Sequence, residues 1–381
     1  MRLKTVVKLG TMVSVLLFVL AMGYYALMRL DMTKHHREVN LFSLVPSDCV
    51  GVLDSDNIYA FLDECSNLNY SKELEGFQFP GLFSFLLNEL NDYTSGSHGV
   101  SHEMSRLAVS FHRSGTSLDQ VVYFRMGMAD EQLLSDVLQE YMPGNFLPKE
   151  ETYREKTMQI YPLYHDKFLV VYEEEDFVVL SYQKRLVEKV IDAQLDGTSL
   201  NGDAVFTDMV GKKKTQHSLR LYGRSASLPF LDLGTDCWSE YEFHLNSDVL
   251  YLMGETYMPD SSVSLKAVKA HLEEVPIVKE EEVVVSAMRD STVLFMTQAF
   301  DMNDGGNRTL FNECVANLAE EAAFTLVTDM QKVEKEPHRF QPYLPSYVLE
   351  NVSLFRPFVL SVQLSLNGER LTHMWVFTYK N

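Results

Sequence analysis

The pattern of hydrophobic and polar positions divides the chain into one long apolar segment and a larger region of short, alternating runs. No charged side chain occurs from Leu9 to Met28. A helix of this length is about 30 Å long, which matches the hydrocarbon core of a bilayer. We therefore expect residues 9–29 to span a membrane, because a single segment in lipid can pair its backbone groups only as a helix.

The basic residues on the two flanks of this segment usually indicate which side of the membrane the body occupies. Both flanks carry three basic residues, so the positive-inside rule does not separate them. A short basic leader before an apolar run is typical of a signal-anchor. We therefore expect residues 1–8 to be a cytoplasmic tail, residues 30–43 a juxtamembrane stalk, and the body to lie outside the cytoplasm, on the periplasmic or extracellular face. Cleavage after Gly23 remains open, although the apolar run continues past it.

The remaining chain predicts an α+β fold with largely antiparallel sheets and packed helices. Short alternating or continuous apolar runs predict strands at 49–53, 106–111, 120–125, 152–162, 168–173, 177–181, 218–222, 238–245, 249–255, 283–288, 292–300, 358–366 and 369–378. Apolar residues at helical spacing predict helices at 58–65, 82–90, 129–141, 183–194, 265–272 and 309–329. Asn367-Gly368 predicts a type I′ turn in the last hairpin.

The length of the body favours two domains. About 345 residues lie beyond residue 37, which is more than one hydrophobic core usually organises. We place the domains at 44–232 and 233–381. A strand followed by a helix with a similar sequence occurs in each, ending in Cys65 and in Cys314, which raises the possibility of two related halves.

Charge and cysteine content narrow the classes of partner. The chain has a formal net charge of −20, and without residues 1–37, which hold six basic and one acidic side chain, the body has −25. Such a surface repels nucleic-acid phosphates and anionic lipid headgroups. A cationic partner fits the charge, but no segment locates it. The four cysteines either form disulfides, in one of three full pairings, or remain free thiols; they are Cys49, Cys65, Cys237 and Cys314.

Two segments carry a resemblance to a known family. Val45-Pro46-Ser47-Asp48 precedes the first predicted strand of the body, and Ser199-Leu200 is followed by Asp203 and Phe206. Together with the basic leader and single span, this resembles a family of uncharacterised bacterial single-pass envelope proteins over residues 40–225. That family has no established activity, so the resemblance implies an exported α+β body and assigns no site residue.

Metal-binding patterns are incomplete. His98 and His102 have the spacing of two metal ligands on a helix, but Gly96 and Gly99 disfavour a helix there. Residues 301–307 begin like a calcium loop, yet glycine and asparagine occupy positions that need a ligand and a bidentate glutamate. We therefore predict no metal site and no cofactor.

Catalytic motifs are also incomplete. Residues 211–215 lack the first glycine of a phosphate loop, and residues 197–201 lack the second glycine of a nucleophile elbow. The acidic runs at 173–176 and 280–282 are consecutive, so neighbouring carboxylates point to opposite faces of a strand. We predict no catalytic residue.

These observations favour a membrane-anchored, non-enzymatic envelope protein that binds a protein partner or a second copy of itself. Two alternatives remain: a carrier of a lipid or small apolar ligand, given 23 Phe and 18 Met, and an exported hydrolase whose site residues converge from distant segments. The hydrolase would be favoured if several of the following lined one pocket: Asp48, Asp54, His98, His102, Asp203 and His244.

Overall fold

The computed structural model describes residues 39–72, 82, 106–112, 119–127, 134–135, 138, 147–163, 167–212, 219–234, 236–276, 278–280, 282–287, 309–318, 322–368 and 370–380. Leu41–Asn381 forms one compact unit. The expected cytoplasmic tail, the expected span at 9–29 and most of the stalk lie outside the described residues. Within the described ranges no helix is both long and apolar enough to cross a bilayer.

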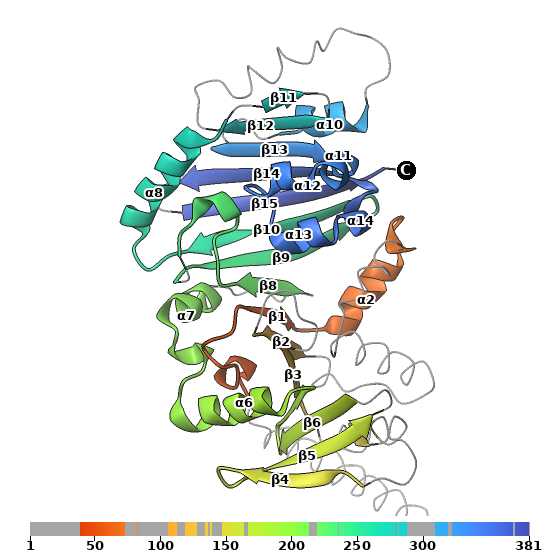
Figure 1. Ribbon diagram of the computed structural model, residues 1–381, viewed down its shortest axis with the longest axis vertical. Coiled ribbons are helices and arrows are strands. Elements are labelled where there is room, and N and C mark those ends of the chain that lie inside the picture. The colour runs from red at the N-terminus through yellow and green to blue at the C-terminus, as the bar shows by residue number, and fades with distance from the viewer. Residues whose placement is uncertain are drawn as a thin grey trace, which may run out of the picture. The chain divides into compact units, whose positions relative to one another are not determined.

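The described body is built on a single antiparallel sheet of fifteen strands (Figure 1), which confirms the α+β expectation. The strands lie in the order β11-β12-β13-β14-β15-β10-β9-β8-β1-β2-β3-β7-β6-β5-β4. Their bounds are β1 Gly51–Ser55, β2 Leu107–Phe111, β3 Gln120–Arg125, β4 Lys149–Tyr153, β5 Lys156–Leu163, β6 Lys167–Glu174, β7 Phe177–Ser181, β8 Arg220–Gly223, β9 Trp238–Asn246, β10 Val249–Tyr257, β11 Val278–Glu280, β12 Val283–Ala287, β13 Phe324–Asp329, β14 Phe358–Asn367 and β15 Arg370–Tyr379.

Both halves of the chain cross this sheet by the same route (Figure 1). In the first half, β1 to β3 step outward, the chain passes to the edge strand β4, and β5 to β7 step back until β7 pairs with β3. In the second half, β9 and β10 step outward, α8 (Ser261–Glu274) leads to the edge strand β11, and β12 to β15 step back until β15 pairs with β10. Because β8 and β9 are paired, the sheet is continuous across the expected domain boundary. A division into domains at 44–232 and 233–381 remains a prediction.

One face of the sheet carries two hydrophobic cores. The N-terminal core includes the cross-strand neighbours Leu53, Val109 and Val122 and is covered by α2 (Ile58–Ser66). The C-terminal core is larger and includes Trp375. Four short helices cover it and lie in front of the sheet in Figure 1: α11 Met330–Lys335, α12 Pro337–Phe340, α13 Ser346–Glu350 and α14 Val352–Phe355. The ring of Phe243 packs against both cores, so they meet at β9.

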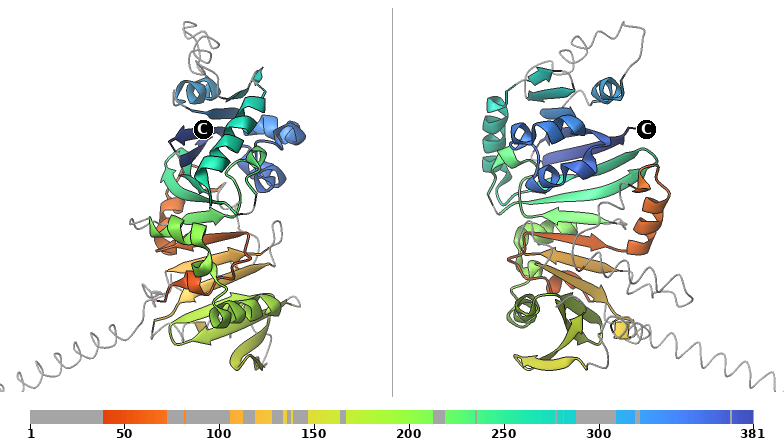
Figure 2. Two further views of the ribbon diagram at one scale, coloured as in Figure 1. Left: turned by 90° about the vertical axis from the view of Figure 1, so that its left-hand side faces the viewer. Right: turned by 45° about the vertical axis from the view of Figure 1, so that its right-hand side comes forward.

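The opposite face is covered separately in each half. In the first half, α6 (Lys184–Asp196) packs across β3, β6 and β7, and α7 (Ala204–Gly211) follows it, joined by the short helix η2 (Leu200–Gly202). The short helix η1 (Leu41–Ser43) contacts β2 and β3. In the second half, α10 (Leu310–Ala316) packs on β13 and β14, on the side away from the helices of the C-terminal core (Figure 2). One more short helix, η3 (Pro229–Leu231), precedes β9.

The expected helix at 309–329 is wrong in its second part. The helix α10 ends at Ala316, and Phe324–Asp329 forms β13, which pairs with β12 on one side and β14 on the other. Residues 324–329 are rich in β-branched and aromatic side chains, which fit a pleated surface. Backbone pairing on both edges outweighs the helical spacing of the apolar residues.

Two turns also differ from expectation. The expected strand 152–162 is two strands, because Arg154 and Glu155 have positive φ angles of 47° and 67° and turn the chain between β4 and β5. In the last hairpin, Asn367 pairs with Arg370 and is the final residue of β14. The turn therefore begins at Gly368, with φ 64°, one residue later than expected. The expected elements at 82–90, 129–141 and 292–300 lie largely or wholly outside the described residues.

Candidate functional site

The hairpin formed by β2 and β3 brings three polar side chains together on the face of the sheet that α6 and η1 cover. Ser110 lies on β2 and His112 directly follows the strand, two residues later, so both point to the same face of the sheet. His112 Nε2 lies 2.9 Å from Ser110 Oγ. Ser110 Oγ lies 2.9 Å from the hydroxyl of Tyr123 on β3. These contacts form a chain of hydrogen bonds, Tyr123–Ser110–His112, across two strands.

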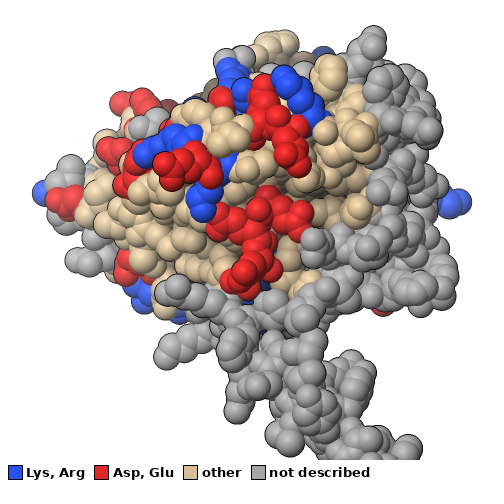
Figure 3. Space-filling view, turned by 90° about the horizontal axis from the view of Figure 1, so that it is seen from below, with Lys and Arg blue, Asp and Glu red and all other residues tan. Residues whose placement is uncertain are grey.

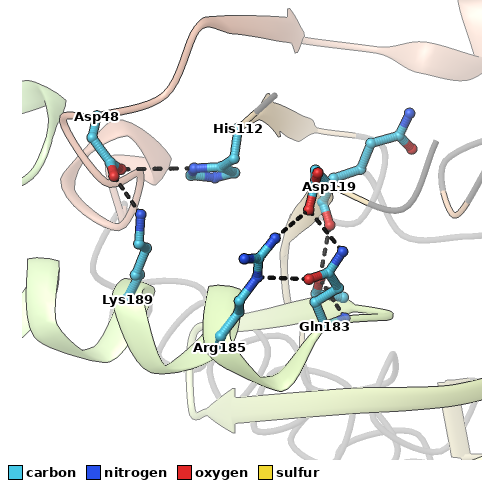
Figure 4. A network of polar contacts seen from close by, with 8 residues as sticks. Asp48, His112, Asp119, Gln183, Arg185 and Lys189 are labelled. Atoms are coloured by element: carbon cyan, nitrogen blue, oxygen red, sulfur yellow. Dashed lines mark hydrogen bonds and ion pairs between the residues drawn. The ribbon is translucent and has the colours of Figure 1, made fainter. Parts of the chain in front are cut away.

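Asp48 lies between this chain and the surface and faces His112 without a hydrogen bond to it (Figure 4). It lies just before β1, and its Oδ1 is 3.7 Å from His112 Nδ1. Asp48 Oδ2 forms an ion pair with the ammonium of Lys189 on α6. The side chain of Asp48 is 57% exposed, whereas that of His112 is 5% exposed. The four residues Tyr123, Ser110, His112 and Asp48, which we name the polar relay, therefore run from the buried sheet to solvent.

A second set of contacts fixes the start of α6 to the same hairpin (Figure 4). The buried carboxylate of Asp119, directly before β3, accepts hydrogen bonds from Gln183 Nε2 at 2.7 Å and from Arg185 Nη2 at 2.8 Å. Arg185 Nε also donates to Gln183 Oε1 at 2.7 Å. Because Gln183 and Arg185 flank the first residue of α6, these contacts hold the helix over the polar relay.

Burial sets the protonation states within the polar relay. Burial lowers the pKa of His112 to about 4, and the nearby carboxylate of Asp48 offsets only part of that effect. Burial alone would raise the pKa of Asp48, but the hydrogen bond and positive charge of Lys189 outweigh it and hold that pKa below its usual value. Burial also raises the pKa of Tyr123. At neutral pH the relay thus contains a carboxylate, a neutral imidazole and a protonated phenol.

Serine, histidine and aspartate are the residue types of nucleophile, general base and orienting acid in acyl transfer, but the orienting hydrogen bond from Nδ1 of His112 to Asp48 is missing. The distance between Ser110 Oγ and His112 Nε2 suits proton transfer. Ser110 is 0% exposed, however, and its strand is paired with β1 and β3 on its two edges. A reacting carbonyl would have to come within about 3 Å of Oγ, which this packing prevents. The polar relay in this conformation is sealed.

The structure brings together only some of the residues that the sequence analysis named for a hydrolase site. Asp48 joins the polar relay, whereas Asp203 belongs to a different network, described next. Asp54 lies on β1 and His244 on β9, and His98 and His102 lie outside the described residues. Sequence reasoning missed Ser110, His112 and Tyr123. The available signal was two polar residues at alternate positions in the apolar run at 107–112, which indicates a polar face buried under another element.

The two segments that carry the family resemblance contact each other directly. Pro46 and Ser199 form an isolated antiparallel bridge. The backbone N–H of Ser47 donates to the carbonyl of Thr198 at 3.0 Å, and that of Leu200 donates to the carbonyl of Val45 at 2.9 Å. The two segments thus pair through their backbones, and we name this contact between residues 45–48 and 198–203 the joint.

Asp203 is the centre of that joint. Its Oδ1 accepts from the Phe206 backbone N–H at 3.1 Å and caps α7, and its Oδ2 accepts from Arg224 Nη2 and Trp238 Nε1, both at 3.1 Å. Arg224 also donates to the Ser47 carbonyl and lies 4.7 Å from the centre of the Trp238 ring. These contacts join α7 to the first strand of the second half. They are structural in character, because both oxygens of Asp203 are occupied by groups of the protein itself.

The four cysteines are all described, and all are free thiols. Burial raises the pKa of Cys49 and of Cys65 to about 12 and that of Cys237 to about 11, and it also raises the pKa of Cys314. The thiolate, which is the reactive form, is therefore disfavoured at neutral pH. In the described part of the chain, no group of three or more histidine, cysteine or carboxylate side chains is placed to hold a metal ion.

The end of the sheet near β4 carries many charges of both signs, with acidic side chains gathered near the middle of the view in Figure 3. Arg154 contacts Asp192 and Asp196, Lys156 contacts Glu174, and Lys184 contacts Glu151. Exposed pairs of this kind contribute little to stability. They make this surface soluble and do not form a site.

Comparison with known proteins identifies no relative. No protein-family model, no curated protein and no solved structure matches the chain. The resemblance to bacterial envelope proteins stays a prediction, based on the basic leader, the charge-free run and the two segments at 45–48 and 199–206.

Proposed function

We propose that the protein is a membrane-anchored, non-enzymatic component of the cell envelope, held by residues 9–29 with its body on the periplasmic or extracellular face. The observation that carries the non-enzymatic part is the complete burial of Ser110, the nucleophile position of the polar relay. The charge-free run from Leu9 to Met28 supports the anchor. The partner is a protein, or a second copy of this chain, because the acidic body repels nucleic acid.

The topology is tested with a C-terminal epitope tag on the full chain in intact cells. Protease added outside should remove the tag after the outer barrier is permeabilised, without lysis of the inner membrane. A matched chain with residues 9–29 deleted should keep its tag under the same treatment, because it stays in the cytoplasm. Digestion of the tag only after full lysis would contradict the proposed location.

The binding role is tested by placing a photo-crosslinking residue at exposed apolar positions. Leu147 is 87% exposed and Phe168 is 56% exposed, so each can reach a partner. The buried Leu180 is the control position. We expect a discrete adduct from at least one exposed position and none from Leu180. Absence of any adduct from a panel of exposed positions, in cells that express the full chain, would contradict a binding role.

The alternative of an exported hydrolase is favoured by one observation, the alignment of Ser110, His112 and Asp48. For this chemistry α6 would have to move away, after which Ser110 Oγ could attack an electrophile while His112 accepts its proton. A fluorophosphonate probe tests this: Oγ would bond to phosphorus, fluoride would leave, and labelling would disappear in Ser110→Ala but not in Ser181→Ala. No Ser110-dependent labelling is expected under the non-enzymatic proposal.

A further inference from the structure

Two arginines lie opposite each other at the end of the β2–β3 hairpin that is remote from His112. The ladder pairs Leu107 with Phe124, and the backbone N–H of Arg125 donates to the carbonyl of Arg106 at 3.4 Å, so these two residues form the next pair. The alternation of β3 places Arg125 on the same face as Tyr123, and Arg106 continues the face of Ser110. Directly opposite side chains on neighbouring strands are about 5 Å apart at Cβ.

The guanidinium groups of this pair lack partners within the described part of the chain. Nε of Arg106 and both Nε and Nη1 of Arg125 are buried and make no hydrogen bond, and no described carboxylate forms an ion pair with either residue. A guanidinium group cannot lose its charge in a protein. Like charges directly opposite on neighbouring strands repel, and buried unpaired N–H groups cost free energy. An anion between or beside the two groups would remove the repulsion and supply hydrogen-bond acceptors for the three buried nitrogens.

Other described arginines differ from this pair in having a carboxylate partner, although Nε of Arg220 and of Arg224 is likewise buried without a hydrogen bond. Arg154, Arg185, Arg224 and Arg339 each contact at least one carboxylate within 3.1 Å. Arg220, on β8, contacts Glu242 at 3.2 Å. Acidic residues outnumber basic ones in this chain, 53 to 33, so a carboxylate partner is the ordinary outcome. A pair of arginines without one needs a separate explanation.

We propose that Arg106 and Arg125 bind the oxyanion of a ligand, a phosphate or a carboxylate, through the paired N–H groups of the two guanidinium forks. Planar forks of this kind match the oxygen spacing of both groups and bind them with two parallel hydrogen bonds. A body with net negative charge does not attract anions non-specifically, so the two arginines must supply the local positive potential. The site does not depend on the membrane-anchored role proposed above.

The test is thermal unfolding of the full chain in detergent, with increasing inorganic phosphate or acetate against chloride at constant ionic strength. We expect at least one of the two anions to raise Tm in a saturable way, by several degrees. Phosphate acting alone would identify a phosphate ligand, and acetate acting alone a carboxylate ligand. Arg106→Gln and Arg125→Gln should each lose the shift, whatever their own Tm. Arg125→Lys, which keeps the charge but loses the fork, should retain a smaller shift.

The matched control is Arg356→Gln, an arginine that is 61% exposed and 3.6 Å from Glu334. It should keep the wild-type response. No saturable shift with either anion, or an equal shift in Arg106→Gln, would overturn the proposal. Glu103, Asp130 and Glu131 are near the pair in sequence but outside the described residues. If the wild type showed no response and Glu103→Gln, Asp130→Asn or Glu131→Gln created one, a carboxylate of the chain itself would occupy the site, and a ligand site would be excluded.

Discussion

Among the described residues, each half of the body has one buried histidine, and the two histidines are held in different ways. His112, in the first half, contacts Ser110 and faces Asp48, so its surroundings include side chains that reach solvent. His373, on β15 in the second half, has Nε2 2.8 Å from the carbonyl of Glu240 and its ring 4.6 Å from that of Tyr241. Nδ1 is buried without a hydrogen-bond partner among the described residues in both rings, so the difference lies in the charged groups that His112 faces. The first histidine is linked to the surface, and the second is a packing element.

This difference identifies His112 as the histidine whose pKa can change when charges at the surface change. Burial lowers the pKa of both histidines to about 4, so both are neutral at pH 7. Only His112 also has charged groups nearby: the carboxylates of Asp48 and Asp119 raise its pKa, and Lys189 and Arg185 lower it. A change at the surface can therefore alter the first half's histidine and should leave the second half's unchanged.

The largest expected effect tests the burial of both histidine rings, which lowers the pKa of each. The pKa of each histidine falls from 6.5 to about 4 on folding, so only the unfolded chain takes up these protons between those pH values. The free energy of unfolding is therefore highest above pH 6.5 and decreases as the pH falls toward 4. The loss is about 3 kcal/mol per histidine, or roughly 6 kcal/mol in total. Denaturant unfolding of the full chain between pH 7 and 4 measures it. A flat profile over this range would contradict the burial of both rings.

The next effect tests the joint between the halves. Asp203→Ala removes the cap of α7 and the partner of both Arg224 and Trp238. We expect a loss of about 2–3 kcal/mol, because a cap and a charge-assisted hydrogen bond disappear together. The neighbouring exposed Asp208→Ala is the control and should change stability by less than about 0.5 kcal/mol. Equal effects of the two substitutions would show that Asp203 does not hold the joint.

A smaller effect distinguishes the polar relay from the surrounding core. Tyr123→Phe removes the hydroxyl that contacts Ser110 and leaves the ring in place. We expect a loss of about 1 kcal/mol, since Ser110 keeps His112 as its partner. Equilibrium unfolding at pH 7 measures it. A loss above about 3 kcal/mol would mean that the relay acts as one unit and that its contacts cannot be treated separately.

The substitution with the smallest expected effect on stability tests the difference between the two histidines most directly. Lys189→Met removes the cation that contacts Asp48 at the surface, and we expect a loss below about 1 kcal/mol. Because Lys189 lowers the pKa of His112, its removal should raise that pKa. NMR titration of the histidine ring protons should show the change for His112 and none for His373. A shift of both rings, or of neither, would contradict the assignment of one histidine to the surface and one to the core.

Much of the architecture could be predicted from local sequence. The strand at 120–125 has the expected bounds, and α6, β9, β10, β14 and β15 lie within two residues of expectation. These segments combine a clear hydrophobic period with an adjacent turn or cap, such as Gly197, whose positive φ of 69° ends α6. The segment at 324–329 was assigned to the wrong class because its apolar residues fit both periods, and only pairing with β12 and β14 distinguishes them.

The candidate sites could not be predicted in the same way. Asp48 reaches His112 across 64 positions of sequence, and the Arg106–Arg125 pair depends on the register of one hairpin. Motifs along the chain could not reveal these contacts, because the residues concerned are brought together by sheet pairing and not by spacing along the chain.

By itself, the sequence determined the features that depend on composition and near neighbours: an acidic body, a charge-free segment long enough for a bilayer, and strands and helices with regular periods. The tertiary structure decided which strands are neighbours, that the four thiols are free, and that Ser110 is sealed beneath α6 while Arg106 and Arg125 face each other. The physical reason is that hydrophobic period is a property of a few adjacent residues. Burial and charge pairing, in contrast, depend on distant segments that only the folded sheet places side by side.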